Sequence, residues 1–169
     1  MIKNWDDLRP LFDNDYDHGW LPDIFVNDLT GKQVHEIYTW VRTQTGIYSD
    51  PLAWDRENEC DIQLKSMPDP ARQFLDGRLE SFRHGLELFT FSGVEIPSLT
   101  IAVRDESVEF DYRMGAAWGI SEVSALFDFL WVIQQMAPNA IITHGCEGVG
   151  QGAPEFDTAW NHFKHTKSA

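Results

Sequence analysis

The chain has 169 residues with 27 acidic and 13 basic side chains, which gives a formal net charge of -14 at pH 7. A negative field of this size repels nucleic acid and anionic membrane surfaces and attracts cationic partners. The sequence is also 43% hydrophobic and 13% aromatic, which excludes a disordered acidic tail. We therefore expect a single folded domain over residues 1–169.

Two segments bear on the compartment in which the protein acts. The opening MIKNWDDLRP lacks the basic segment and apolar run of a secretory signal. The most apolar stretch, ALFDFLWVI, is short and contains Asp128, so it does not span a bilayer. We expect a cytoplasmic protein with no membrane partner.

In chain order, the first expected elements are a short apolar strand at residues 23–26 and a helix over 31–46. Residues 48–66 show no clear period. Residues 68–77, PDPARQFLDG, are typical of a short helix that begins at a proline and ends at Gly77. The helix over 31–46 is indicated by four apolar side chains at helical spacing: Val34, Ile37, Tyr38 and Val41.

The second half of the chain carries the clearest periodicity. Residues 84–93 alternate as a strand covered on both faces would. Residues 98–113 alternate with a turn in the middle, which predicts an antiparallel hairpin. Glu109 and Asp111 then project from the face opposite the core. The core face of the hairpin would consist of Leu99, Ile101, Val103, Val108, Phe110 and Tyr112.

The period changes to that of a helix at about Ser121, and the helix is expected to end before Pro138. A last strand is expected at 140–145. The simplest architecture is α+β, with an antiparallel sheet built as a meander or from hairpins and helices packed mainly on one face. A flexible loop over 145–153 and a C-terminal helical tail would complete the domain.

The stretch DNDYDHGW, residues 13–20, raises the question of a metal site. An EF-hand calcium loop needs a glycine at its sixth position and a bidentate glutamate at its twelfth. Counted from Asp13, these positions hold His18 and Ile24, so we expect no tight calcium binding. The stretch is then either an ordinary solvated loop or an acidic surface for a partner. The carboxylates concerned are Asp13, Asp15 and Asp17.

Other chemical motifs are weak. Cys60 and Cys146 lack CxxC spacing, so we expect buried or partly buried thiols. His162 and His165 offer either two imidazoles to zinc or nickel or the polar tip of a terminal helix. The glycines of 145–153 lack the Lys-Ser/Thr pair of a phosphate loop, and neither GxSxG nor HExxH occurs. We expect no cofactor, no metal and no catalytic residue.

Tryptophan is frequent, with seven residues in the chain. Trp20, Trp54 and Trp118 lie in polar, loop-like sequence rather than on apolar stripes. Such rings either pack in the core or serve as anchors at an interface, where tryptophan is enriched. We select Trp20 and Trp118 as candidate anchors for a partner.

Residues 98–144 resemble the C-terminal half of small bacterial immunity proteins that protect cells from polymorphic or contact-dependent toxins. The resemblance consists of the VEFDYRMG strand, Trp118 shortly after it, a helix rich in Leu and Phe, and a short closing strand. It implies a non-catalytic inhibitor in the cytosol or periplasm, often acidic where the toxin is a basic nuclease. It covers about a quarter of the chain and transfers no catalytic residue.

Two functions therefore compete. In the first, an immunity protein covers the active site or substrate-binding surface of a cognate toxin that has a basic surface and acts in the cytosol. In the second, a small hydrolase-like enzyme uses an aromatic cleft with a carboxylate and histidine acid/base pair. The candidate partner-binding residues of the first are Asp13, Asp15, Asp17, Trp20, Glu109, Asp111 and Trp118.

Overall fold

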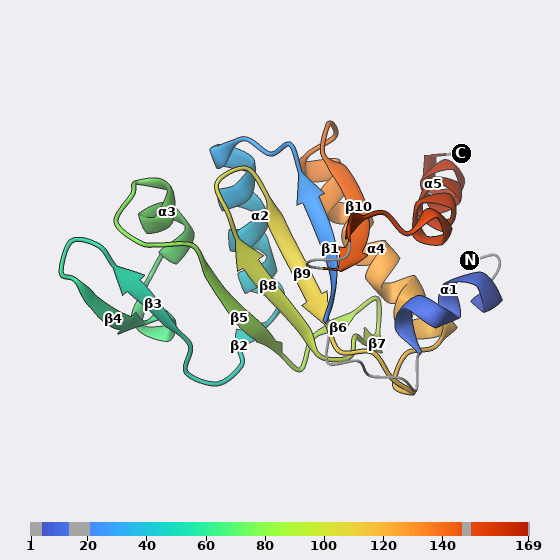
Figure 1. Cartoon of the computed structure of the whole chain (residues 1–169), viewed down its shortest axis with the longest axis horizontal. Coiled ribbons are helices and arrows are strands. Elements are labelled where there is room, and N and C mark those ends of the chain that lie inside the picture. Colours follow the sequence, from blue (N-terminus) through green and yellow to red (C-terminus); the bar gives the residue numbers. More distant parts are fainter. Residues whose placement is uncertain (1–4, 14–20, 147–149, 169) are drawn as a thin grey trace.

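The computed structural model of the chain describes residues 5–13, 21–146 and 150–168, and its elements are labelled in Figure 1. The helices are α1 Trp5–Phe12, α2 Gly31–Gln44, α3 Pro70–Leu75, α4 Ile120–Met136 and α5 Pro154–Ser168. The strands are β1 Pro22–Asn27, β2 Gly46–Ile47, β3 Leu52–Asp55, β4 Cys60–Gln63, β5 Phe82–Glu87, β6 Thr90–Phe91, β7 Val94–Glu95, β8 Leu99–Val103, β9 Val108–Tyr112, β10 Ile141–Cys146 and β11 Gly150–Gln151.

Seven of these strands form one antiparallel sheet in the order β11-β10-β1-β9-β8-β5-β2. The central run β9-β8-β5 includes the expected hairpin, in which Phe110 lies opposite Ile101. Strand β1 lies between β9 and β10, so it joins parts of the chain far apart in sequence. The α+β class and the antiparallel sheet are confirmed, with β1 inserted where a simple meander would have none.

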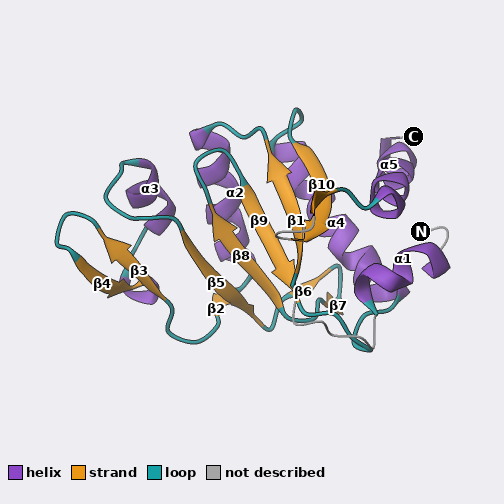
Figure 2. Cartoon of the chain, viewed as in Figure 1, coloured by secondary structure: helices purple, strands orange, loops and turns teal. Residues whose placement is uncertain are grey.

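The four longer helices pack on one face of this sheet. Rings on α1, α4 and α5 contact Tyr112, Phe110 and His144 respectively, and Tyr38 of α2 contacts His84. Phe110 and His144 both lie opposite Ile24 in the register, which places them on the same face. Figure 2 shows α2 and α4 together behind the strands, with α1 and α5 beyond β10. The expectation of helices on one face is confirmed.

The core lies between this face and the helices. All six predicted core residues of the hairpin are 2% exposed or less. Helix α2 begins at a capping box in which Thr30 Oγ1 accepts from Gln33 N, and the four apolar residues predicted for it are buried. Helix α3 has Pro70 in its first turn, and Gly77 follows with φ +81°. The predictions for α2, α3 and α4 are therefore confirmed.

Two expectations about local structure are wrong, and one segment that could not be assigned from its sequence is regular. Residues 48–66, which show no clear period, contain the hairpin β3–β4. The strand predicted over 84–93 ends at Glu87, because Leu88 has φ +43° and turns the chain. Cys60 is an exposed free thiol on β4 and is not buried.

The β3–β4 hairpin is fixed to the domain by a buried carboxylate. Asp55 is fully buried, and its Oδ1 accepts from the turn amides Glu57 N at 2.9 Å and Asn58 N at 3.2 Å. Its Oδ2 accepts from Arg78 Nη2 at 3.0 Å. The hydrogen bonds from Arg78, followed by those from Asn58, lower the pKa of Asp55 to about 2. The carboxylate is therefore ionised throughout the neutral range.

Replacement Asp55→Ala should lower the midpoint of thermal unfolding clearly, because it leaves a guanidinium and two turn amides without their acceptor. Glu57→Gln is the matched control. Glu57 also pairs with Arg78, but it is exposed and its carboxylate is 3.5 Å from Arg78 Nε, so this ion pair should contribute little to stability. Calorimetry of the two variants measures the difference. Equal midpoints would show that the buried carboxylate does not hold the hairpin.

Candidate functional site

A hollow of about 700 Å³ lies where the ends of neighbouring strands meet. Leu21 precedes β1, Leu88 follows β5, Ser98 precedes β8 and Arg113 follows β9, and all four residues line it. Because these strands are antiparallel, those positions fall at one end of the sheet. The hollow opens on the face of the sheet away from the four longer helices. Thr100 and Asp111 line it, and they alternate along β8 and β9 with residues that face the helices, so their side chains point to the opposite face.

Exposed apolar side chains gather around this hollow. Among the described residues, seven large hydrophobic side chains are classed as exposed, and three of them line this one hollow. They are Leu21 at 43%, Tyr48 at 64% and Leu88 at 80% exposed. Single exposed apolar residues are ordinary, but a group rimmed by polar residues is typical of a protein-interaction site.

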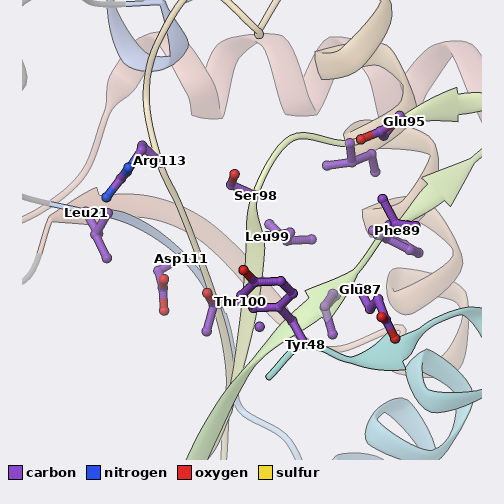
Figure 3. A pocket seen from close by; sticks show the side chains of 14 residues that line it. Leu21, Tyr48, Glu87, Phe89, Glu95, Ser98, Leu99, Thr100, Asp111 and Arg113 are labelled. Atoms are coloured by element: carbon purple, nitrogen blue, oxygen red, sulfur yellow. The ribbon is translucent and has the colours of Figure 1, made fainter. Parts of the chain in front are cut away.

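Tyr48 lies directly on the sheet because its neighbour is a glycine. Tyr48 N donates to Gly85 O at 2.9 Å, which continues the pairing of β2 with β5. A Cβ atom at Gly85 would lie 3.2 Å from Tyr48 Cβ and 3.4 Å from its ring. Figure 3 shows the ring of Tyr48 over the floor of the hollow, between Thr100 and Glu87. An exposed aromatic ring with a fixed backbone is well suited to act as an anchor.

Two residues on the rim have a backbone conformation that their side chains disfavour. Leu88 has φ +43° and Ser98 has φ +39°, both in the left-handed region. For a leucine this conformation is uncommon and costs energy. Leu88 thus combines a strained backbone with an apolar side chain that is 80% exposed to water. Neither feature helps the isolated fold, and both point to a function in binding.

The charged residues of the hollow are mainly acidic. Glu87, Glu95 and Asp111 line it together with one cation, Arg113. The two glutamates are exposed, whereas Asp111 is only 3% exposed. Figure 3 shows Glu87 and Glu95 on one side of the hollow and Asp111 beside Leu21 and Thr100 on the other. The site therefore joins apolar contacts with negative charge.

The structure places only part of the sequence-predicted site residues at the hollow. Glu109 and Asp111 both lie on the expected face of β9, but Glu109 is paired with Arg104 at 3.2 Å and lies outside the hollow. Asp13 follows α1, and its carboxylate is 3.0 Å from Arg9 Nε. Asp15, Asp17 and Trp20 lie outside the described residues.

Trp118 lies in the core. It is 2% exposed, its ring contacts Phe12 and Tyr112 at centroid distances of 5.2 and 5.0 Å, and Nε1 donates to Arg113 O at 2.8 Å. This location gives the indole no surface with which to touch a partner. Leu21, Tyr48 and Leu88 were not selected from the sequence, where a leucine in the alternating stretch 84–93 gives no sign of being exposed.

Metal-ligating groups are scattered in the described ranges. Within residues 5–13, 21–146 and 150–168, no three His, Cys, Asp or Glu side chains are placed to hold one ion. His162 and His165 lie on α5, where His162 is half-buried and lines a second hollow against α1 while His165 is exposed. The pair therefore lies on a C-terminal helix, which both interpretations of it require.

A histidine and a carboxylate do meet at the junction of α2 and α3. His35 Nε2 lies 2.9 Å from Asp69 Oδ2. Asp69 Oδ1 also accepts from Arg72 N and caps α3, and the hydrogen bond from His35 contributes to lowering the pKa of Asp69 against the opposing effect of burial. The pair thus connects α2 to the start of α3. Neither residue lines the hollow described above.

No protein-family model matches the sequence, and no curated protein matches it significantly. Among solved structures, the fold is similar to a chain in the crystal structure of the toxic C-terminal tip of CdiA from Pseudomonas aeruginosa in complex with an immune protein. The TM-score is 0.52 at 11% sequence identity, over 76% of this chain and 87% of that chain. This likeness is one of fold, and it agrees with the resemblance to immunity proteins seen in residues 98–144.

Within the described part of the chain, no helix combines the length and apolar character needed to cross a bilayer.

Proposed function

We propose that this protein is an immunity protein that binds a cognate bacterial toxin and neutralises it without performing chemistry. One observation carries the proposal: three exposed apolar side chains and three carboxylates surround one hollow on a fold similar to a chain of a toxin–immune protein complex. Apolar anchors in a polar rim are the usual composition of a specific interface.

The chemistry of the surface suggests how neutralisation works. A toxin that binds phosphate-containing substrates needs lysine and arginine in its cleft. A chain of net charge -14 would accelerate the encounter with such a surface, and its carboxylates would occupy the cleft in place of substrate. Tyr48, Leu21 and Leu88 would then slow dissociation, because central apolar contacts are desolvated in the complex.

Co-expression tests this function. A candidate toxin taken from the neighbouring genes is induced in a host with and without this protein, and the intact chain should restore growth. A stoichiometric complex should also be recovered by size exclusion. Equal killing with and without the protein would contradict the immunity function and leave the hydrolase-like enzyme as the alternative.

Replacement Tyr48→Ala should weaken toxin binding by about 2 kcal/mol or more, the size of an interface hot spot, and Leu88→Ser should act in the same direction. Both side chains are mainly exposed, so the free energy of unfolding should change little. Ile141→Ser is the matched control, because Ile141 is 52% exposed but lies opposite Asn27, at the other end of the sheet. An equal loss of affinity in the control would show that the hollow is not the interface.

A further inference from the structure

Asp111 is an unusual group in the wall of the hollow. Its side chain is 5% exposed, and Oδ2 is buried without a hydrogen-bond donor. Arg83 forms an ion pair with it, but Arg83 Nη2 is 3.6 Å from Oδ2, which is too far for a hydrogen bond. A buried carboxylate oxygen without a donor costs free energy, so its presence here calls for a ligand.

The neighbouring strand adds a second buried carboxylate. Asp23 of β1 lies directly opposite Asp111 of β9 and is 5% exposed. Like charges directly opposite each other on neighbouring strands are destabilising. The wall of the hollow is negative at Asp111, which Asp23 faces from β1, and Glu87 and Glu95 are on its rim.

We propose that the hollow receives an arginine side chain of the toxin, with its guanidinium hydrogen-bonded to Asp111 Oδ2. This inference rests on the proposed function. It identifies the kind of toxin side chain that the hollow binds. The guanidinium would supply the donor that Arg83 does not, and its charge would be balanced by Asp111 and Glu87.

Arginine fits the site better than lysine. A guanidinium presents donors in a planar fork that matches a carboxylate, and it stacks on aromatic faces. The hollow offers both partners, the carboxylate of Asp111 and the exposed ring of Tyr48, on either side of Thr100 (Figure 3). Arg113 also lines the hollow, so three acidic side chains face one basic side chain there.

The test uses N-acetyl-arginine methylamide as the probe and its citrulline analogue, a neutral isostere, as the control ligand. Both are titrated into the full chain while backbone amide signals are followed by NMR. The arginine probe should shift the amides of Gly85, Thr100 and Asp111 in a saturable way, and the citrulline probe should not. The lysine analogue should bind at least about threefold more weakly, because it lacks the planar fork.

Variants then assign the charge that matters. Asp111→Asn keeps the size of the side chain and should weaken probe binding about tenfold, the effect of about 1.4 kcal/mol. Glu109→Gln is the matched control on the same strand and the same face, and it should change binding by no more than about twofold. Urea unfolding of both variants shows whether each is folded.

Equal shifts with arginine and citrulline, or no shifts in the hollow, would overturn the inference even if Asp111→Asn failed to fold. Unchanged binding by folded Asp111→Asn would overturn it as well. These results are separate from co-expression. If the protein protects cells but does not bind the arginine probe, the immunity function stands and the arginine site is wrong. If the protein binds the arginine probe but does not protect cells, the immunity function is wrong and the hollow is still a site for an arginine side chain.

Discussion

Acidification from pH 7 to pH 4 should lower the free energy of unfolding by about 3 kcal/mol for each of two buried histidines, His84 and His144. Burial lowers the pKa of each to about 4 from an ordinary value of 6.5. The side chains are 3% and 4% exposed, so the imidazolium form is poorly solvated in the folded protein. The combined loss is comparable with the whole stability of an ordinary domain.

The sign follows from the direction of the pKa change. The unfolded chain takes up protons as the pH falls through 6.5, while the folded chain takes them up only near 4. The stabilisation by neutral histidine is therefore complete above about pH 6.5 and is lost progressively down to about pH 4. Asp55, with a pKa of about 2, contributes stability that is lost only below about pH 4.

The hydrogen bonds around the two rings can be made by neutral imidazoles, while burial is the main cause of the lowered pKa values and the bond from His84 to the carbonyl of Gly85 opposes it. His84 Nδ1 donates to Gly85 O at 2.9 Å, so Nε2 accepts from the Tyr38 hydroxyl at 3.1 Å. Arg42 adds a positive charge that further lowers the pKa of His84. His144 Nε2 lies 2.7 Å from the Tyr112 hydroxyl, which itself donates to Leu11 O and so ties α1 to the sheet. Protonation would place a buried charge at each position.

Urea unfolding at several pH values measures this effect. The slope should be steepest near pH 5, where it approaches two protons or about 2–3 kcal/mol per pH unit, and His84→Gln or His144→Gln should each remove about half of it. His165→Gln is the control, because His165 is exposed on α5. Ring-proton NMR shifts of His84 and His144 that titrate near 6.5 would contradict the prediction.

Much of the fold could be predicted because large hydrophobic residues follow the period of the element that holds them. In the hairpin of residues 98–113, Ile101 and Phe110 alternate with residues of the other face and lie opposite each other in the core. In α2, Val34 and Ile37 follow the helical period and are fully buried. A one-residue shift of either pattern would bury the wrong face.

The β3–β4 hairpin could not be predicted because its pattern is inverted. Ala53 and Asp55 point inward, while Leu52 and Trp54 are 53% and 41% exposed. Burial of Asp55 depends on Arg78, which lies 23 positions further along the chain. Local periodicity contains no information on such a distant partner.

The hollow escaped prediction for a related reason. Its residues come from the ends of separate strands, and the order β1-β9-β8-β5 that brings them together is not visible in the sequence. Asp111 was selected as an exposed acid, yet it is buried in the wall of the hollow. The sequence indicates which face of β9 carries Asp111, but not what surrounds it.

Tryptophan illustrates the same limit, since Trp54 and Trp118 both lie in polar sequence and have opposite locations. Replacement Trp118→Ala should lower the free energy of unfolding by about 3–5 kcal/mol, because it removes a fully packed ring and leaves a cavity next to Phe12 and Tyr112. Trp54→Ala should cost about 1 kcal/mol or less, because the ring is already 41% exposed. Urea unfolding of the two variants compares the same chemical change in two environments.

The consequence for toxin binding separates a core role of Trp118 from a role at the interface. When a variant differs only in stability, its apparent dissociation constant is the intrinsic constant divided by the folded fraction. If Trp118→Ala keeps a few kcal/mol of stability, nearly all of it is folded at low temperature, and its affinity for the toxin should equal that of the wild type. Protection of cells would then fail at elevated temperature only. A weaker complex formed by a variant with unchanged stability would instead place Trp118 at the interface, against its 2% exposure.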